Sequence, residues 1–306
     1  MRVSPYLLLC LTALFWGGNW VIARGLQDSM SPVAMSFWRW LIALFILLPF
    51  VARSMIAERR AIASSWKIMA VLGVLGVCGF TILCYTGLKY TMASNALLLN
   101  SVTPVLIIAV SFVFFGERAQ PRQLAGVLIS LAGMLVIVAR GELQTLLDLS
   151  VNRGDVWVLS AVAAWAVYTV CLRWRPADLS SLAFTGSVIA IGVFAIAPLF
   201  AWDYAQGSRT QWNAATAGAV IYFSVFPSVL AYFFWNRSVR EVGANRAGFF
   251  MHLVPVFGIA LSVVFLHESL AAFHAVGAAL IFTGIYLASK RLPLREWEKV
   301  VEDSAG

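Results

Sequence analysis

Long apolar runs separated by short polar connections extend along the whole chain. An α-helix needs roughly 20 apolar residues to cross the hydrocarbon core of a membrane. The pattern predicts ten membrane-spanning helices, near residues 6–23, 33–52, 66–88, 93–115, 123–139, 156–172, 180–202, 214–236, 244–266 and 271–289. The first run continues past Trp16 without a small-residue cleavage pattern, so we expect it to be a retained span and not a signal peptide.

The composition agrees with lipid as the solvent of this chain. Hydrophobic residues make up 61% of the 306 residues and charged residues 12%, whereas soluble domains average about 45–50% apolar and about 25% charged. The sequence therefore predicts an all-α integral membrane protein embedded in the lipid bilayer. The formal net charge of +8 does not indicate a nucleic-acid partner, because the basic residues are dispersed between apolar runs.

The placement of lysine and arginine predicts the orientation of the chain. Short cytoplasmic loops accumulate basic residues. When the loops are assigned alternately to the two sides, 16 of the 22 basic residues fall on the side of both termini and six on the other. We therefore expect both termini in the cytoplasm.

The chain contains an internal repeat. Matching residues lie 151 positions apart, as in Pro104 and Pro255, Glu117 and Glu268, Gly126 and Gly277, and Gly133 and Gly284. Trp16 and Trp165 match at an offset of 149. Each copy holds five helices, and this odd number turns the second copy upside down in the membrane. Inverted repeats around a site near the midplane are typical of alternating access.

The repeat predicts the organisation of the chain. We expect a first five-helix repeat at residues 1–140 and an extracytoplasmic linker at 141–155. A second five-helix repeat would follow at 156–290, and a polar cytoplasmic tail at 291–306.

Several short motifs resemble those of a known family. They are Phe15-Trp16-Gly17-Gly18-Asn19, Phe37-Trp38-Arg39-Trp40, Pro104 with Phe115-Gly116-Glu117-Arg118, and Pro255 with Leu266-His267-Glu268. Over nearly its whole length the chain resembles an EamA-type ten-helix transporter of the drug/metabolite transporter superfamily. The resemblance implies ten helices around a central cavity, a bacterial inner membrane, and export of small metabolites such as amino acids.

Polar and aromatic side chains within the spans are the candidates for a substrate site. Polar groups are costly in lipid and usually face a bundle interior or a cavity. The candidates for contact with a small-molecule substrate are Trp16, Asn19, Tyr85, Asn95, Asn100, Trp165, Tyr168, Tyr232, Trp235 and His252. The repeat places Trp16 and Trp165 on equivalent helices, where two indoles can flank a bound molecule. Helix packing is the alternative interpretation for both.

Two interpretations of Arg39 are open. Its guanidinium can contact the carboxylate of an amino acid, or it can extend from near the helix end to the membrane interface or cap neighbouring carbonyls. The repeat has Ala190 at the equivalent position, so Arg39 is not part of the shared scaffold.

Two pairs of repeated residues mark bends and connections. Pro104 and Pro255 fall inside predicted helices, where each removes a backbone hydrogen bond and favours a kink, so we predict hinges there. Glu117 and Glu268 precede the fifth and tenth helices, where we expect them to accept hydrogen bonds from helix N-terminal amides.

The energy source and the chemistry are less defined by the sequence. No acidic residue lies in the middle of a span and no ATP-binding phosphate loop is present, which favours facilitated diffusion or exchange. His252 keeps a proton-coupled exporter of drugs or organic cations open as an alternative.

The spacing of His267 and His274 does not match a zinc motif. We therefore expect no metal, no cofactor and no catalysis, with an intramembrane enzyme or a receptor as weaker alternatives. The oligomeric state is open, and a monomer is plausible.

Overall fold

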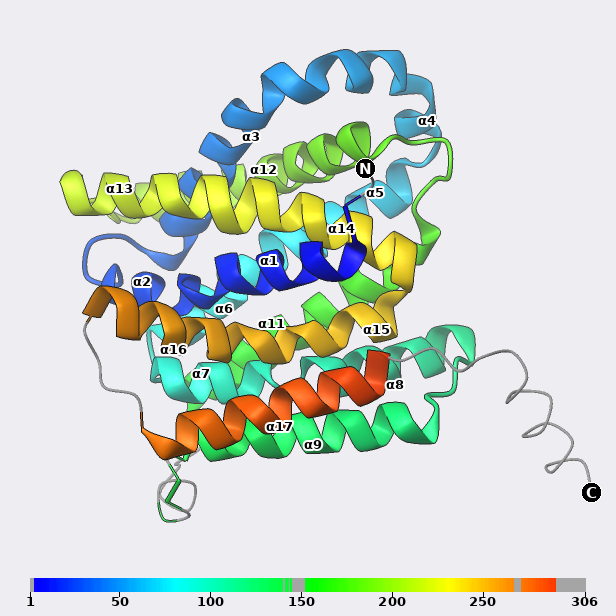
Figure 1. The fold of residues 1–306 in the computed structure, drawn as a ribbon. Coiled ribbons are helices and arrows are strands. Elements are labelled where there is room, and N and C mark those ends of the chain that lie inside the picture. The colour runs from blue at the N-terminus through cyan, green and yellow to red at the C-terminus, as the bar shows by residue number, and fades with distance from the viewer. Residues whose placement is uncertain (1–2, 140, 143, 145–151, 267–270, 290–306) are drawn as a thin grey trace, which may run out of the picture.

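The computed structural model describes residues 3–139, 141–142, 144, 152–266 and 271–289. All regular secondary structure within these ranges is helical. The long helices run roughly side by side, so the bundle has two ends, at the left and right of Figure 1. Nine helices of the described chain are long and apolar enough to cross a membrane, and Pro5–Gly17 is a shorter apolar helix. The predicted all-α architecture of ten spans is confirmed.

The first half of the chain supplies five spans from ten helical elements. These are α1 (Pro5–Gly17), α2 (Asn19–Gly25), α3 (Pro32–Ala57), α4 (Arg59–Ser64), α5 (Trp66–Leu72), η1 (Gly73–Gly79), α6 (Phe80–Leu88), α7 (Ala93–Asn100), α8 (Thr103–Phe115) and α9 (Pro121–Val138).

The second half repeats this order. Its elements are α11 (Arg153–Cys171), η2 (Leu172–Trp174), α12 (Ser181–Ala205), α13 (Ala214–Phe223), η3 (Ser224–Leu230), α14 (Ala231–Val242), α15 (Ala244–Gly248), η4 (Phe249–His252), α16 (Leu253–Leu266) and α17 (Ala272–Ser289). Most ends lie within a few residues of the predicted ones. The clearest difference is α14, which continues to Val242 past the predicted end at residue 236.

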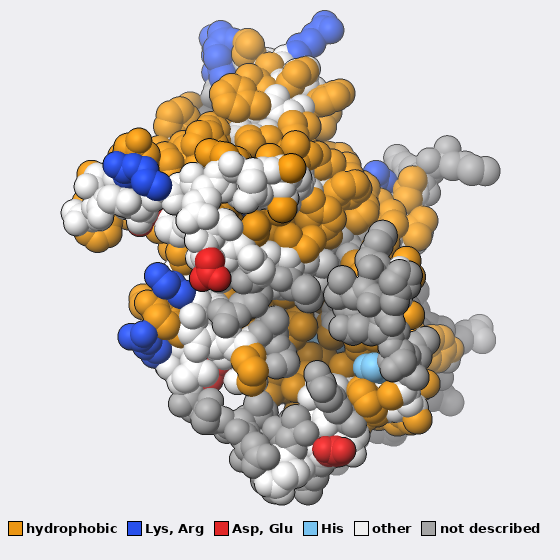
Figure 2. Space-filling view, turned by 90° about the vertical axis from the view of Figure 1, so that its left-hand side faces the viewer, with side chains coloured by type: hydrophobic (Ala, Val, Ile, Leu, Met, Phe, Trp, Pro, Cys, Tyr) orange, Lys and Arg blue, Asp and Glu red, His pale blue; other side chains and the backbone are white. Residues whose placement is uncertain are grey.

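The two ends of the bundle differ in charge. The connections that follow α8, η2 and α14 meet at one end, together with α1's first residues, and we call it the basic end. The arginines in and beside these connections are Arg118, Arg173, Arg175, Arg237 and Arg240. Figure 2 faces the opposite end, where basic side chains form separate spots on a largely neutral surface.

Helices α9 and α17 pack against each other through glycines related by the repeat. A Cβ atom at Gly126 would lie 2.5 Å from the carbonyl oxygen of Gly284, and one at Gly284 would lie 2.4 Å from that of Gly126. Gly133 and Gly277 oppose each other in the same reciprocal way, at 2.6 and 2.7 Å. Such backbone approach is open only to glycine. Because Gly126 matches Gly277 and Gly133 matches Gly284, the two halves meet about a pseudo-two-fold axis.

Two π-helical segments lie at equivalent places in the two halves. η1 begins at Gly73 and η3 at Ser224, and both the first and last residues of the segments are 151 positions apart. π-Helical turns are rare and occur frequently at functional sites. The sequence analysis did not predict either segment.

The repeated prolines begin helices instead of bending them. α7 ends at Asn100, and Pro104 lies in the first turn of α8. Likewise Pro255 is the third residue of α16, which follows the 3₁₀ turn η4. Proline is well tolerated in the first turn, where its missing N–H has no helical partner to lose. The expectation that each proline lies inside one continuous helix is therefore wrong, because each span is broken just before its proline, and the hinges stay a prediction.

The predicted capping role of Glu117 is also wrong. The carboxylate of Glu117 pairs with the Arg173 guanidinium from the connection after α11. The N-terminus of α9 is capped by a reciprocal pair of hydrogen bonds between Gln120 and Gln123. The matching residue Glu268 lies outside the described residues, as does His267.

Candidate substrate site

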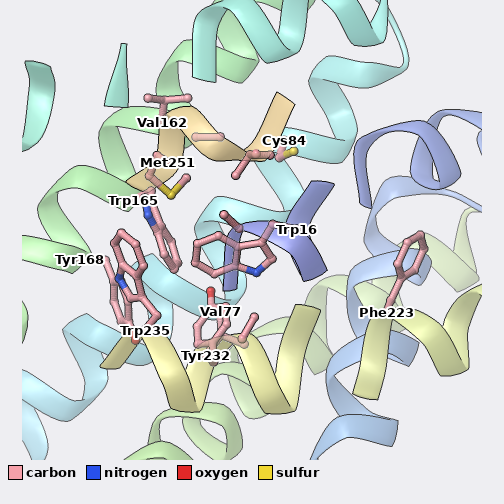
Figure 3. Close-up of a cluster of buried hydrophobic side chains, with 14 of the residues drawn as sticks. Trp16, Val77, Cys84, Val162, Trp165, Tyr168, Phe223, Tyr232, Trp235 and Met251 are labelled. Atoms are coloured by element: carbon pink, nitrogen blue, oxygen red, sulfur yellow. The ribbon is translucent and has the colours of Figure 1, made fainter. Parts of the chain in front are cut away.

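Five aromatic side chains from three helices meet at the centre of the bundle. Trp16 comes from α1, Trp165 and Tyr168 from α11, and Tyr232 and Trp235 from α14. Their rings converge in Figure 3. The centroids of Trp16 and Trp165 are 5.2 Å apart, and Trp235 lies 5.3 Å from Trp16 and 5.6 Å from Trp165. The two tryptophans related by the repeat are thus in direct contact.

The π-helical segments receive hydrogen bonds from this aromatic cluster. The Trp16 indole Nε1 donates to the carbonyl oxygen of Pro227 in η3 at 3.0 Å. The Tyr232 hydroxyl donates to the carbonyl oxygen of Gly76 in η1. Gly76 and Pro227 are themselves 151 positions apart. A π-helical turn leaves backbone carbonyls outside the regular ladder, which explains why each segment has an acceptor to offer to the cluster.

A small cavity of about 20 Å³ lies beside the cluster. Its lining residues are Trp16, Asn19, Trp20, Arg39, Phe80, Asn100, Trp165, Tyr232, Met251 and Val254. No acidic residue is among them. The volume is about that of one water probe sphere, so a larger molecule enters only if the surrounding rings separate.

Arg39 lies in a polar cluster nearer the end opposite the basic end. Its side chain is buried, and Nη1 donates to the Tyr85 hydroxyl at 2.6 Å and to Asn19 Oδ1 at 3.1 Å. Nε donates to Ser228 Oγ in η3 at 2.6 Å. Tyr85 and Asn19 are also bonded to each other, at 3.3 Å. A guanidinium held this way does not extend to the membrane interface, so that interpretation of Arg39 is wrong.

A second asparagine–tyrosine pair lies toward the basic end. The Tyr168 hydroxyl donates to Asn236 Oδ1 at 2.6 Å, and both residues are buried. The repeat matches Tyr168 with Asn19 and Asn236 with Tyr85. The hydrogen-bonded pair therefore occurs twice, with the two residue types exchanged. The second copy has no arginine, because Ala190 occupies the position that matches Arg39.

Several donors of the aromatic cluster have no partner. Trp165 Nε1, Trp235 Nε1 and Asn236 Nδ2 are buried and make no hydrogen bond within the described structure. A buried donor without an acceptor costs about 1–3 kcal/mol. Of the three residues, only Trp165 lines the cavity.

The remaining candidates lie apart from the cavity or only at its edge. The His252 Nε2 lies 2.7 Å from the carbonyl oxygen of Ser101, and its Nδ1 lies 2.6 Å from Ser130 Oγ. Because a carbonyl only accepts, Nε2 carries the proton. His252 and Ser101 are 151 positions apart, so this bond joins the two broken spans. Asn95 does not line the cavity, whereas Asn100 does.

Sequence reasoning missed Ser228 and four residues of the cavity lining, Trp20, Phe80, Met251 and Val254. Ser228 accepts the Arg39 Nε bond from the other half of the chain, and Phe80 packs on Trp165 at 5.1 Å. Ser228 lies in the predicted span at residues 214–236, which the repeat matches with the glycine-rich third span. This match was the nearest sequence signal for Ser228.

The arrangement defines a class of protein. It is a multi-pass membrane protein of two inverted five-helix repeats, with an aromatic and polar site between them. Within the residues described, no group of three or more His, Cys, Asp or Glu side chains is placed to hold a metal ion. The chain matches the EamA-like transporter family over residues 3–139 and 152–290, and it belongs to that family.

Similar proteins span the same length. An uncharacterized transporter of Archaeoglobus fulgidus is 31% identical over 95% of this chain and 99% of its own. The uncharacterized transporter YyaM of Bacillus subtilis is 26% identical over 94% of both chains. A protein of Streptantibioticus cattleyicolor named a probable terminal-alkyne amino-acid exporter is 26% identical over 92% of both chains.

A solved crystal structure shares the fold. It superposes with a TM-score of 0.72 at 22% sequence identity, and the match covers 94% of this chain and 97% of that chain. The solved structure supports the fold, and the family match shows a membrane transporter of the EamA family.

Proposed function

We propose that this protein exports amino acids or closely related small metabolites by alternating access, through facilitated diffusion or exchange. The observation that carries the proposal is the asparagine–tyrosine pair that occurs once on each side of the aromatic cluster. Two equivalent barriers on opposite sides of one site are what alternating access requires.

In this proposal each pair closes one side of the site. The Asn19–Tyr85 pair with Arg39 seals the end opposite the basic end, and the Tyr168–Asn236 pair seals the basic end. The small central cavity, about 20 Å³, corresponds to a state with both barriers closed. Separation of one pair, and of the tryptophan rings behind it, admits a substrate from one side only.

The polar groups of the site suit a molecule that carries a carboxylate. Arg39 is a buried cation, and neither ion pair found among the described residues involves it. A buried charge without a counter-charge is costly, so a carboxylate at this place is favoured. The aromatic rings offer a broad apolar surface for a side chain. An organic cation without a carboxylate would meet Arg39 and find no acidic residue in the lining of this cavity.

The charge of the two ends supports an orientation. The basic end would face the cytoplasm of a bacterial cell, with both termini there, because basic connections remain on that side. Reporter fusions at the C-terminus test this: a cytoplasmic fluorescent reporter should be active, and a periplasmic phosphatase should not.

Counterflow in liposomes tests the proposed cargo. Purified protein preloaded with unlabelled amino acid should accumulate the radiolabelled form saturably, and organic cations should neither accumulate nor compete. Saturable counterflow of cations without amino acids would reject the cargo. A proton flux strictly coupled to the substrate would reject facilitated diffusion.

Paired tryptophan variants test the site. Trp16→Ala/Trp165→Ala should lower counterflow at least about tenfold, since it removes both indoles that face the cavity. The matched control is Trp157→Ala/Trp202→Ala, which removes two exposed indoles and should transport normally. Equal counterflow by the two double variants would reject the aromatic site and leave the transporter class intact.

A further inference from the structure

A larger cavity lies at the basic end, outside the aromatic cluster. Its volume is about 380 Å³, enough to enclose a small amino acid. The lining residues come from the ends of α8, α11 and α14 and the connections after them, and they include Glu117, Thr169, Arg173, Arg175 and Arg240. We call it the vestibule.

Arg175 is the buried cation of the vestibule. Only 9% of the residue is exposed. Its Nη2 donates to the carbonyl oxygen of Leu179 at 2.7 Å, and its guanidinium lies 4.4 Å from the centroid of the Phe184 ring. These contacts fix the side chain, yet its Nε and Nη1 are buried without a hydrogen-bond partner. The Phe184 ring contacts one face of the guanidinium and the Leu179 carbonyl one edge. The remaining N–H donors are therefore available to an oxygen ligand.

A second group of the vestibule is also without a partner. Thr169 Oγ1 is buried and makes no hydrogen bond within the described structure. Thr169 follows Tyr168 directly, so the vestibule adjoins the Tyr168–Asn236 pair that bounds the aromatic cluster.

The charges around the vestibule favour an anion. Arg173, Arg175 and Arg240 line it, and Glu117 is the one acidic residue in the lining. Glu117 is already paired with Arg173. Burial, and next the nearby Arg240, lower the pKa of Arg175 to about 10, so its guanidinium stays charged near neutral pH.

We propose that the vestibule is a carboxylate-binding site at which Arg175 and Thr169 receive the cargo before it passes the Tyr168–Asn236 pair. The proposal rests on the transport function proposed above. A carboxylate oxygen accepts from one of the two unpartnered donors of Arg175, Nε or Nη1, in a charge-assisted hydrogen bond. The Thr169 hydroxyl donates to the same group. This site is distinct from the central cavity, which Arg39 lines at the other side of the aromatic cluster.

Fluorine NMR of the purified protein in neutral detergent tests the site without transport. The probe is 4-fluorophenylacetate, and its neutral match is 4-fluorophenylacetamide. The carboxylate signal should broaden saturably and the amide signal should not. Arg175→Gln should weaken carboxylate binding about tenfold or more, because charge-assisted hydrogen bonds are lost. Thr169→Val should weaken it less.

Two controls separate this site from its surroundings. Arg237→Gln removes a basic-end arginine that is paired with Glu241 and does not line the vestibule, so it should bind the probe normally. Trp16→Ala/Trp165→Ala disables the proposed central site and should keep the part of probe binding that Arg175→Gln removes. Loss of binding in that double variant, equal binding of the amide, or unchanged binding in Arg175→Gln would each overturn the proposal.

The controls also distinguish a failure here from a failure of the proposed function. If counterflow finds no amino-acid transport while Arg175 still governs carboxylate binding, the vestibule site stands and the cargo is wrong. If amino acids are transported and Arg175→Gln binds like the wild type, the vestibule proposal fails alone. If Arg175→Gln does not fold, Arg175→Lys and Thr169→Val provide the same comparison while the positive charge at residue 175 is kept.

Discussion

The two asparagine–tyrosine pairs differ in what holds them together. The Asn19–Tyr85 pair is bonded to a buried guanidinium that also reaches Ser228 in the other half. The Tyr168–Asn236 pair has a single hydrogen bond of 2.6 Å and an amide nitrogen with no partner. Opening the first pair separates the charged Arg39 guanidinium from three neutral partners. Opening the second pair breaks one hydrogen bond between neutral groups. Charge-assisted bonds are roughly twice as strong, so we expect the basic-end pair to open more readily.

Replacement of Arg39 should have the largest effect on this difference. Arg39→Gln removes the charge and most of the bonds that join Asn19, Tyr85 and Ser228. We expect counterflow to fall about tenfold to 100-fold and the free energy of unfolding to fall by about 2–3 kcal/mol. Counterflow in liposomes and thermal unfolding in detergent measure the two quantities.

The controls for Arg39 separate charge from geometry. Arg39→Lys keeps the charge without the planar fork and should recover part of the transport. Arg237→Gln removes a partly exposed arginine and should change stability by less than about 1 kcal/mol. Normal transport by Arg39→Gln would show that the charge at the first pair does not matter for the cargo.

A glycine in η1 offers a way to disturb the second pair. A Cβ atom at Gly76 would lie 2.5 Å from two atoms of the Tyr168 ring, so Gly76→Ala should displace the ring and lengthen its bond to Asn236. We expect a loss of about 1–3 kcal/mol in unfolding free energy, as for other overpacked sites.

The control is Gly218→Ala in α13, where the added Cβ meets nothing within 4 Å. It should be neutral or stabilise by less than about 1 kcal/mol, because alanine favours a helix over glycine. Similar midpoints of thermal unfolding for both variants would mean that the Tyr168 ring moves without cost.

Much of the scaffold was predictable because lipid imposes a length on every span. Ten apolar runs of suitable length and a constant offset of 151 were enough to predict the helices and the inverted repeat. The exchange of Asn19 and Tyr85 for Tyr168 and Asn236 was also present in the sequence, but only pairwise comparison of the two repeats would reveal it.

Other features depend on contacts between the halves. Residues 73–79 and 224–230 share a single identical position, Val74 and Val225, and nothing local in them requires a π-helical turn. Each segment is instead bonded to an aromatic side chain of the cluster. Arg39 meets Ser228 at a separation of 189 residues, and no local pattern reveals such a partner. For the same reason, Glu117 looked like a helix cap until its contact with Arg173 was visible.

The smallest expected effect is that of Tyr168→Phe, and it is best measured against Tyr85→Phe. Tyr168→Phe removes one neutral hydrogen bond and leaves Asn236 Oδ1 without a donor, at a cost of about 1 kcal/mol. Tyr85→Phe removes the acceptor of the 2.6 Å bond from Arg39 Nη1, and a bond to a charged group is worth about 1.5–3 kcal/mol. Both variants keep the ring, so packing is unchanged, and thermal unfolding with counterflow measures each. If Tyr168→Phe proves the more destabilising of the two, the neutral pair is the stronger barrier and the expected order of opening is reversed.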